Sequence, residues 1–253
     1  MQALVLAAGW ATRLGALALA TPKHLLPIGR GCSLDIVVDR LCQTPNIRAI
    51  HIITHRVYHP QFVAWQARRT RPLPVHIMSD GTRSVDERLG SIGDIAYFIA
   101  ESRLQDDLLI VAGDNVFDFG LADLATRAER EPVVGVYDVG SLELASRYGV
   151  VELDAQSYVT SFVEKPAQPR SSLAAIAIYG FPRATLGDVH AYLAAGGSPD
   201  KSGSLIEWLH TRRRVAGHVF VGHWFDIGSP DEYARVQELF GAEADQAWSP
   251  AQV

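Results

Sequence analysis

The first half of the chain alternates short apolar runs with longer amphipathic segments. Runs rich in Ile, Val and Leu and bounded by turn residues predict buried strands at 2–8, 47–54, 73–78 and 107–113. Between these runs, apolar residues recur at helical spacing over 33–43, 59–69 and 90–102. Strands that alternate with helices predict a parallel sheet covered by helices on both faces, a three-layer α/β/α arrangement. In such sheets, ligands usually lie beyond the carboxyl ends of the strands.

After residue 130 the pattern changes to closely spaced strands. We predict them at 133–139, 149–153, 158–164, 174–181 and 215–222. A closing helix is predicted over 231–240, with Ser229 as its N-cap and Pro230 at the first helical position. The sheet should therefore be mixed but mostly parallel, with a β-rich extension. We expect one domain over 1–240, divided into halves 1–130 and 131–240, and a flexible tail over 241–253.

Composition narrows the class of protein. The chain has 253 residues, 48% of them hydrophobic, which is enough for a substantial core. Its 23 Lys and Arg residues against 28 Asp and Glu give a net charge of −5, so we expect no nucleic-acid partner. We also expect no membrane partner, because no apolar run approaches the roughly 18 residues of a spanning helix.

The same features predict where the protein acts. The N-terminus lacks the basic start of a signal peptide, so we expect a cytoplasmic protein with Cys32 and Cys42 as reduced thiols. The arginine cluster at 68–71 is most simply interpreted as a solvated helix end. Assembly into a homo-oligomer stays open.

The segment that follows the first strand has the layout of a phosphate site. It reads LAAGWATRL over 6–14 and continues to TPKHLLP over 21–27. Small residues let backbone N–H groups approach phosphate oxygens, and two cations, Arg13 and Lys23, follow. The dinucleotide fingerprint and the Gly-Lys-Ser/Thr loop are both missing. The segment therefore favours a loop that binds a triphosphate. The simpler alternative is a tight strand-to-helix turn with surface cations.

Acidic and basic residues follow three further predicted strands. Asp114 in VAGDN and Asp226 in WFDIGSP each stand at a strand end, where two carboxylates could hold one Mg²⁺ and leave positions for phosphate oxygens. For either residue alone, a turn-capping role is at least as good an explanation. Lys165 in FVEKP ends another strand and could hold a second, anionic substrate.

In this order, the segments resemble a known family of enzymes. The chain is similar to the sugar-1-phosphate nucleotidyltransferases, typified by glucose-1-phosphate thymidylyltransferase. The resemblance covers residues 2 to about 240 and rests on LAAGWATRL, TPKHLLPI, LGSIGDI, VAGDNVF, RYGVVE, FVEKP and HWFDIGSPDEY. It implies a Rossmann-like α/β nucleotidyltransferase fold, with the nucleotide bound by the first half and the sugar phosphate by the second.

The resemblance implies roles for residues of the first half. The backbone at Ala8 and Gly9 would lie against the base and phosphates, and Gly90 would pack near the base. Arg13 would contact the triphosphate and Lys23 the region of the α-phosphate. These residues, together with Asp114 as a nucleotide and metal ligand, would form the nucleotide subsite.

Residues of the second half would form the sugar subsite. Tyr148 and Gly149 would line the sugar pocket, with Tyr179 close by. Glu164 would bind sugar hydroxyls, and Lys165 would bind the sugar's phosphate. Each of these residue types suits the chemistry assigned to it.

The reaction implied is attack of a sugar 1-phosphate oxygen on the α-phosphorus of a nucleoside triphosphate, which gives a nucleotide sugar and pyrophosphate. Mg²⁺ on Asp114 and Asp226 would orient the α-phosphate, with Arg13, Lys23 and Lys165 as the catalytic cations. The favoured substrates are dTTP and a hexose 1-phosphate. The charged stretch at 79–89 departs from the family pattern, and so do Ala11 and the apolar residues before Tyr179. GTP or CTP with an unusual sugar phosphate is therefore an alternative.

Two other classes compete with this interpretation. A metal-dependent glycosyltransferase would use closely spaced acids such as Asp114 and Asp118, but the triphosphate-type cations argue against it. A silent regulatory homologue would be expected to have lost some of the site residues. His51, His55 and His59 are spaced by four residues, but a strand and a proline interrupt them, so we interpret them as structural.

Overall fold

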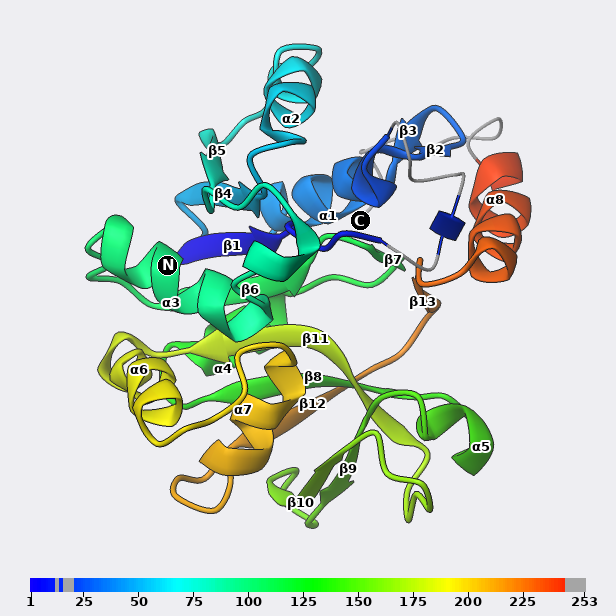
Figure 1. The fold of residues 1–253 in the computed structure, drawn as a ribbon. Helices are drawn as coiled ribbons and strands as arrows, with labels where there is room; N and C mark the ends of the chain where they lie inside the picture. Colours follow the sequence, from blue (N-terminus) through cyan, green and yellow to red (C-terminus); the bar gives the residue numbers. More distant parts are fainter. Residues whose placement is uncertain (12–13, 16–20, 244–253) are drawn as a thin grey trace.

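A nine-stranded mixed sheet forms the centre of the computed structural model, which describes residues 1–11, 14–15 and 21–243 (Figure 1). Its first half is parallel, in the order β6, β1, β4, β5. These strands are Gln2–Leu6 (β1), Ala49–Thr54 (β4), Val75–Ser79 (β5) and Leu108–Ala112 (β6). The four strands predicted for this half are confirmed. The apolar runs of β1, β4 and β6 reflect burial on both faces of the sheet, whereas most of the edge strand β5 is half-buried or exposed.

The second half of the sheet is mostly antiparallel. Strand β11 (Leu173–Phe181) pairs with β6 and joins the two halves into one sheet. The other strands are β8 (Val133–Asp138), β9 (Gly149–Leu153), β10 (Val159–Glu164) and β12 (Ala216–Phe220). The register between β11 and β8 shifts between Ala175 and Tyr179, where Ala177 has a φ of 53°. The mixed, mostly parallel α/β fold predicted from the sequence is confirmed.

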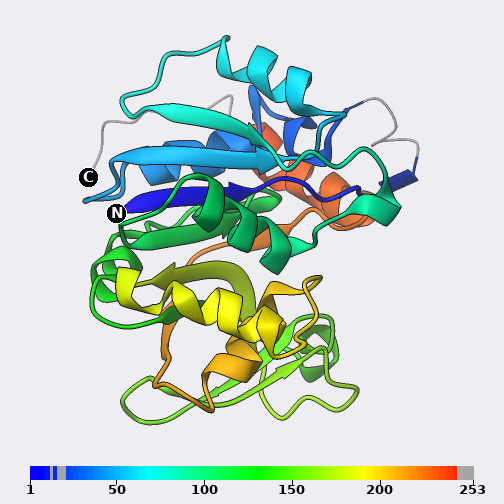
Figure 2. The same cartoon turned by 60° about the vertical axis from the view of Figure 1, so that its left-hand side comes forward.

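Helices cover both faces of the sheet (Figure 2). One face packs against α1 (Ser33–Cys42), α2 (His59–Gln66) and α4 (Ala122–Ala128). The other face packs against α3 (Ser91–Glu101), α6 (Gly187–Ala194) and α7 (Ser202–Leu209). Apolar side chains of the strands fill both interfaces, so each core lies between the sheet and one helical layer. Helices α1, α2 and α3 were predicted, whereas α4, α6 and α7 were not.

Smaller elements gather at the carboxyl end of the parallel strands. A two-stranded sheet pairs β7 (Asn115–Phe117) with β13 (Trp224–Asp226), and a hairpin joins β2 (Pro27–Ile28) to β3 (Gly31–Cys32). Helix α8 (Pro230–Glu243) packs beside them through Tyr233 and Val236. The short helix α5 (Leu142–Ala145) precedes β9.

The closing helix, predicted over 231–240, is longer in the structure. Helix α8 runs to Glu243, so the first three residues of the predicted flexible tail are helical. Residues 244–253 lie outside the described part of the chain. Within the described ranges, no helix is both long and apolar enough to cross a membrane.

Candidate active site

An ion pair lies at the carboxyl end of the parallel strands. Asp114 follows β6 in a tight turn, and Lys23 begins a short 3-10 helix after the predicted phosphate loop. The ammonium of Lys23 donates to Asp114 Oδ2. Burial is the largest single effect and opposes ionisation of this carboxyl, but the charges of Lys23 and His24 and the hydrogen bonds that it accepts together outweigh burial, so the pKa of Asp114 is below its usual range. Asp114 is therefore a carboxylate at neutral pH.

Asp226 ends β13 next to this pair, and its pKa is shifted in the opposite direction from that of Asp114. Burial, together with the charges of Asp114 and Glu232, raises the pKa of Asp226 to about 6. The hydroxyl of Tyr148 donates to Asp226 Oδ1 at 2.9 Å, and burial raises the pKa of that phenol as well. Two carboxyl groups thus share a poorly solvated region with too little positive charge between them.

This arrangement fits a magnesium ion. Carboxylate oxygens are the protein ligands that Mg²⁺ prefers, and one or two of them suffice when phosphate oxygens and water complete the shell. No cluster of three or more His, Cys, Asp or Glu side chains able to enclose a metal occurs within the described ranges. Burial and the charge of Asp114 both raise the pKa of Asp226, and a cation between the two carboxylates would relieve the repulsion between them.

The predicted phosphate loop lies beside Lys23. Ala8 is buried and Gly9 is exposed, and a side chain added at Gly9 would lie 3.8 Å from Lys23 Cε. Trp10 stacks on His55, with ring centroids 3.9 Å apart and nearly parallel planes. Arg13, the predicted triphosphate contact, lies outside the described residues.

Gly90 has a clear steric reason to be glycine. Its φ is 77°, and a Cβ there would lie 2.5 Å from the carbonyl oxygen of Pro199. The backbone N–H groups of Ser91 and Ile92 donate to the carbonyls of Asp200 and Pro199. The close approach of Gly90 to Pro199 and these two hydrogen bonds tie the start of α3 to the loop before α7. That Gly90 packs near the base stays a prediction.

At the end of β10, Glu164 is held by close packing against glycines. A Cβ at Gly203 would lie 2.0 Å from Glu164 Oε2, and one at Gly149 would lie 3.1 Å from the same oxygen. Burial raises the pKa of Glu164, although Lys165 and Lys201 oppose this effect. The carboxyl therefore occupies a recess that only glycine leaves open.

Tyr148 connects the end of β10 to Asp226. Its backbone carbonyl accepts from the N–H of Lys165 at 3.0 Å, while its hydroxyl contacts Asp226. Lys165 has an exposed side chain and a φ of 52°, a conformation that turns the chain sharply after β10. Tyr179 is buried in β11, and its hydroxyl lies 3.1 Å from Ser202 Oγ.

Several residues near the candidate site residues were not predicted from the sequence. Lys201, Ser202 and Gly203 come from the start of α7, an unpredicted helix, and approach Glu164 or Tyr179. Asn115 and Trp224 lie beside the two carboxylates and are hydrogen-bonded to each other. An asparagine directly after Asp114 and a tryptophan two residues before Asp226 were the available signals.

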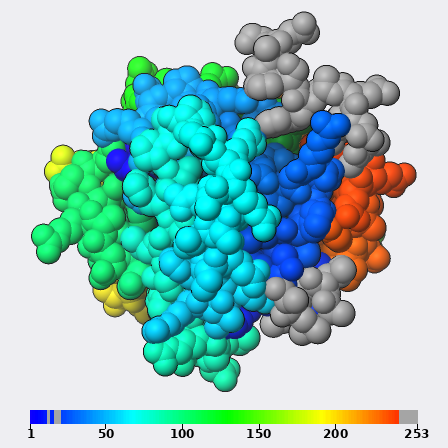
Figure 3. Space-filling view, turned by 90° about the horizontal axis from the view of Figure 1, so that it is seen from above, coloured from blue at the N-terminus to red at the C-terminus, as the bar shows by residue number. Residues whose placement is uncertain are grey.

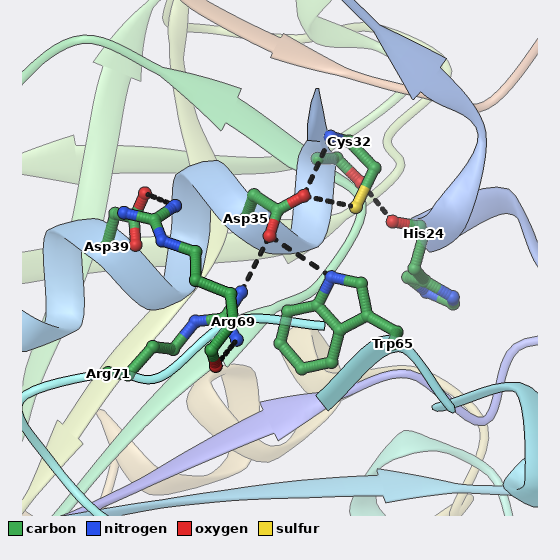
Figure 4. A network of polar contacts seen from close by, with 8 residues as sticks. His24, Cys32, Asp35, Asp39, Trp65, Arg69 and Arg71 are labelled. Atoms are coloured by element: carbon green, nitrogen blue, oxygen red, sulfur yellow. Dashed lines mark hydrogen bonds and ion pairs between the residues drawn. The ribbon is translucent and has the colours of Figure 1, made fainter. Parts of the chain in front are cut away.

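A second polar network lies around Asp35 and borders this site at His24 (Figure 4). Asp35 accepts from the backbone N–H of Cys32, from Trp65 Nε1 and from Arg71, whose side chain is only 3% exposed. Arg69 pairs with Asp39. The interpretation of the arginine cluster at 68–71 as a solvated helix end is therefore wrong for Arg71, because Asp35 compensates its burial.

The network borders a large cavity that is separate from the ion pair of Lys23. The cavity measures about 1060 Å³ and lies among α1, α2, the β2–β3 hairpin and α8. Figure 3 shows this face of the molecule, with α2 in cyan beside α1 and the hairpin in blue. Among the predicted site residues that the structure describes, none lines the cavity.

Other candidates from the sequence have different partners. Asp118 accepts from the backbone N–H of His223 at 2.8 Å and lies 2.7 Å from His223 Nδ1. His51 stacks against His76, and His55 lies between Trp10 and Tyr58. Burial lowers the pKa of His55 to about 4, so this imidazole is neutral.

The fold and this arrangement define a nucleotidyltransferase, and the chain belongs to the Nucleotidyl transferase family, whose sequence pattern matches residues 2–242. It is 29% identical over 247 residues to a glucose-1-phosphate adenylyltransferase from Thermomicrobium roseum, covering 91% of this chain and 57% of that protein. It is 25% identical over 258 residues to a UTP–glucose-1-phosphate uridylyltransferase from Haloferax volcanii, covering 98% of this chain and 99% of that protein.

A solved structure shares the fold. A crystal structure from Bacillus anthracis, described as a "Putative Glucose-1-Phosphate Thymidylyltransferase" in complex with a sucrose, superposes with a TM-score of 0.76 at 21% identity. The match covers 95% of each chain. The present chain spans between 52% and 66% of the length of four of its relatives, the Thermomicrobium roseum protein among them, so their full activities do not transfer to it directly.

Proposed function

We propose that the protein transfers a nucleotidyl group from a nucleoside triphosphate to a sugar 1-phosphate and releases pyrophosphate. The observation that carries the proposal is the meeting of Lys23, Asp114 and Asp226 at the carboxyl end of the parallel strands, next to a second group of residues around Glu164 and Lys165. One group suits a polyphosphate and the other a sugar phosphate. Relatives named for this chemistry with ATP and UTP support it.

In this proposal the catalytic work is electrostatic. Asp114 and Asp226 would hold Mg²⁺, which would neutralise charge on the nucleotide phosphates. Lys23 would exchange its bond to Asp114 for the α-phosphate, and Lys165 would hold the attacking phosphate in line. No general base is needed, because the nucleophile is already an anion. Arg13 keeps its predicted place on the triphosphate.

For the substrates, we propose dTTP and a hexose 1-phosphate as the first pair to test. The relatives are named for the transfer of different nucleotides, so their names do not decide which base this protein takes. GTP and CTP remain the alternatives to dTTP. The glycosyltransferase alternative loses support, because the carboxylate of Asp118 is engaged by His223.

The decisive experiment is a matrix of pyrophosphate release. Five nucleoside triphosphates are each combined with several sugar 1-phosphates in the presence of Mg²⁺, with reactions lacking the sugar phosphate as the control. We expect release that depends on both substrates, and formation of a nucleotide sugar in equal amount. A blank across the whole matrix would contradict the proposal and favour a catalytically silent homologue.

A further inference from the structure

One buried amide joins the elements that carry the two carboxylates. Asn115 directly follows Asp114 and is 2% exposed. Its Nδ2 donates to the backbone carbonyl of Ile176 at 2.8 Å, and its Oδ1 accepts from Trp224 Nε1 at 3.1 Å. Both ends of the amide are used, which fixes its orientation. Asn115 thereby links β7 to β11 and to β13.

The carbonyl of Ile176 is free for this bond because β11 is irregular there. The register between β11 and β8 shifts between Ala175 and Tyr179, and Ala177 has a positive φ. A strand irregularity of this kind leaves residues outside the ladder and redirects their backbone groups. The side chain of Asn115 replaces the missing strand partner of Ile176.

Trp224 continues the connection to Asp226. It is 7% exposed, and its ring contacts that of Tyr148 edge-on at a centroid distance of 5.2 Å. Tyr148 in turn donates to Asp226 Oδ1. In the antiparallel pair of β7 and β13, Asp226 stands opposite Asn115, so Asn115, Asp226 and Trp224 project from the same face. A continuous series of contacts therefore runs from Ile176 to Asp226.

We propose that Asn115 and Trp224 are positioning residues that set the separation of the carboxylates of Asp114 and Asp226. They act through the backbone of β7 and β13 and through Tyr148, and neither contacts a substrate. The inference rests on the proposed function for the use of these carboxylates as a metal site. Supporting residues around metal ligands typically change metal affinity or activity by about 10- to 100-fold when they are replaced.

The first test replaces the indole donor and keeps the aromatic ring. Trp224→Phe removes the bond to Asn115, and Trp65→Phe is its matched control. Trp65 is 5% exposed and donates from Nε1 at 3.1 Å to Asp35, away from the carboxylates. We expect Trp224→Phe to weaken binding of Mn²⁺, measured on the metal alone by electron paramagnetic resonance, about 10-fold. Trp65→Phe should lower thermal stability and leave Mn²⁺ binding unchanged.

The second test asks whether the two residues act as a unit. Asn115→Ala should weaken Mn²⁺ binding at least as much as Trp224→Phe, and the double variant should add little to Asn115→Ala. All variants are compared at a temperature at which circular dichroism shows them to be folded. The Mg²⁺ concentration for half-maximal pyrophosphate release should rise in parallel with the Mn²⁺ dissociation constant.

The outcomes separate this inference from the proposed function. Mn²⁺ binding equal to wild type in folded Trp224→Phe and Asn115→Ala overturns the positioning role, even if the wild type releases pyrophosphate. Wild-type protein that binds no Mn²⁺ also overturns it. Weakened Mn²⁺ binding in both variants, with no pyrophosphate release by any wild-type reaction, keeps the positioning role and rejects the proposed reaction.

Discussion

The two sides of the candidate site hold their charged groups in different ways. On the side of the parallel strands, Asp114 is held by the opposite charge of Lys23. On the side of β9 and β10, Glu164 is held by shape, in a recess formed by Gly149 and Gly203. An ion pair can exchange partners when a phosphate arrives, whereas a recess cannot. Substitutions should therefore act electrostatically on the first side and sterically on the second.

The largest effect is expected from Asp226→Asn. The variant keeps the acceptor for Tyr148 but removes a negative charge from the carboxylate pair, so pyrophosphate release should fall about 10²- to 10³-fold. Steady-state kinetics at saturating Mg²⁺ measure it, with Asp231→Asn in the exposed first turn of α8 as the control. Near wild-type turnover in a folded Asp226→Asn protein would show that the metal assignment is wrong.

Lys165→Ala tests the division between the two sides. Removing one cation from a phosphate contact costs about 1.5–3 kcal/mol, so KM for the sugar phosphate should rise about 10- to 100-fold. KM for the nucleotide should change little. Arg170→Ala removes an exposed cation five residues along the chain and should change neither constant. An effect limited to the nucleotide would contradict the proposed assignment of the two subsites.

Gly203→Ala tests the recess by size alone. Because the added Cβ would lie 2.0 Å from Glu164 Oε2, the carboxyl must move, and KM for the sugar phosphate should rise about 10-fold. Gly187→Ala is the matched control, since Gly187 also stands in the first turn of a helix and has open space around it. Equal kinetics for the two variants would remove Glu164 from the sugar subsite.

The smallest effect on activity is expected away from both sides, at a residue whose replacement should change the stability of the fold. Burial and the charge of Asp80 raise the pKa of Asp94 to about 8, and this side chain is 5% exposed. The folded state then holds a proton that the unfolded state releases above about pH 4, so stability falls as pH rises from 4 to 8, by at most about 1.4 kcal/mol per unit.

Asp94→Asn should abolish that dependence. The variant should melt at a higher temperature than wild type at pH 7.5 and at a similar temperature near pH 4.5. Thermal unfolding followed by circular dichroism measures the difference, with exposed Asp123→Asn as the control. A stability gain that is the same at both pH values would show that Asp94 is ionised in the folded protein.

The parallel half of the fold could be predicted from the sequence, because its strands are long apolar runs separated by breakers. Strands β7 and β13 could not, since three residues carry no periodicity. The irregular end of β11 was also hidden, because the run AAIAIY is uniformly apolar whichever way its backbone turns.

The site divides in the same way into residues that a local sequence pattern predicts and residues that it does not. Lys23, Asp114 and Asp226 were each predicted as site residues, but the ion pair between Lys23 and Asp114 was not predicted. Asn115 and Trp224 are side chains that could equally belong to any core, and the bond between them spans 109 residues of sequence. No local pattern reports such a bond. Arg71 was misjudged for a related reason, because its partner Asp35 lies in α1, 36 residues earlier in the sequence.

The pairing of β7 with β13 also constrains how the molecule is made. Asp114 is synthesised before the middle of the chain, but its neighbour Asp226 and the strand that carries it follow only shortly before the last described helix. A nascent chain can therefore assemble the parallel strands on the ribosome long before the two carboxylates meet. Contacts of such long range form late, so metal binding should report the completion of folding rather than its beginning.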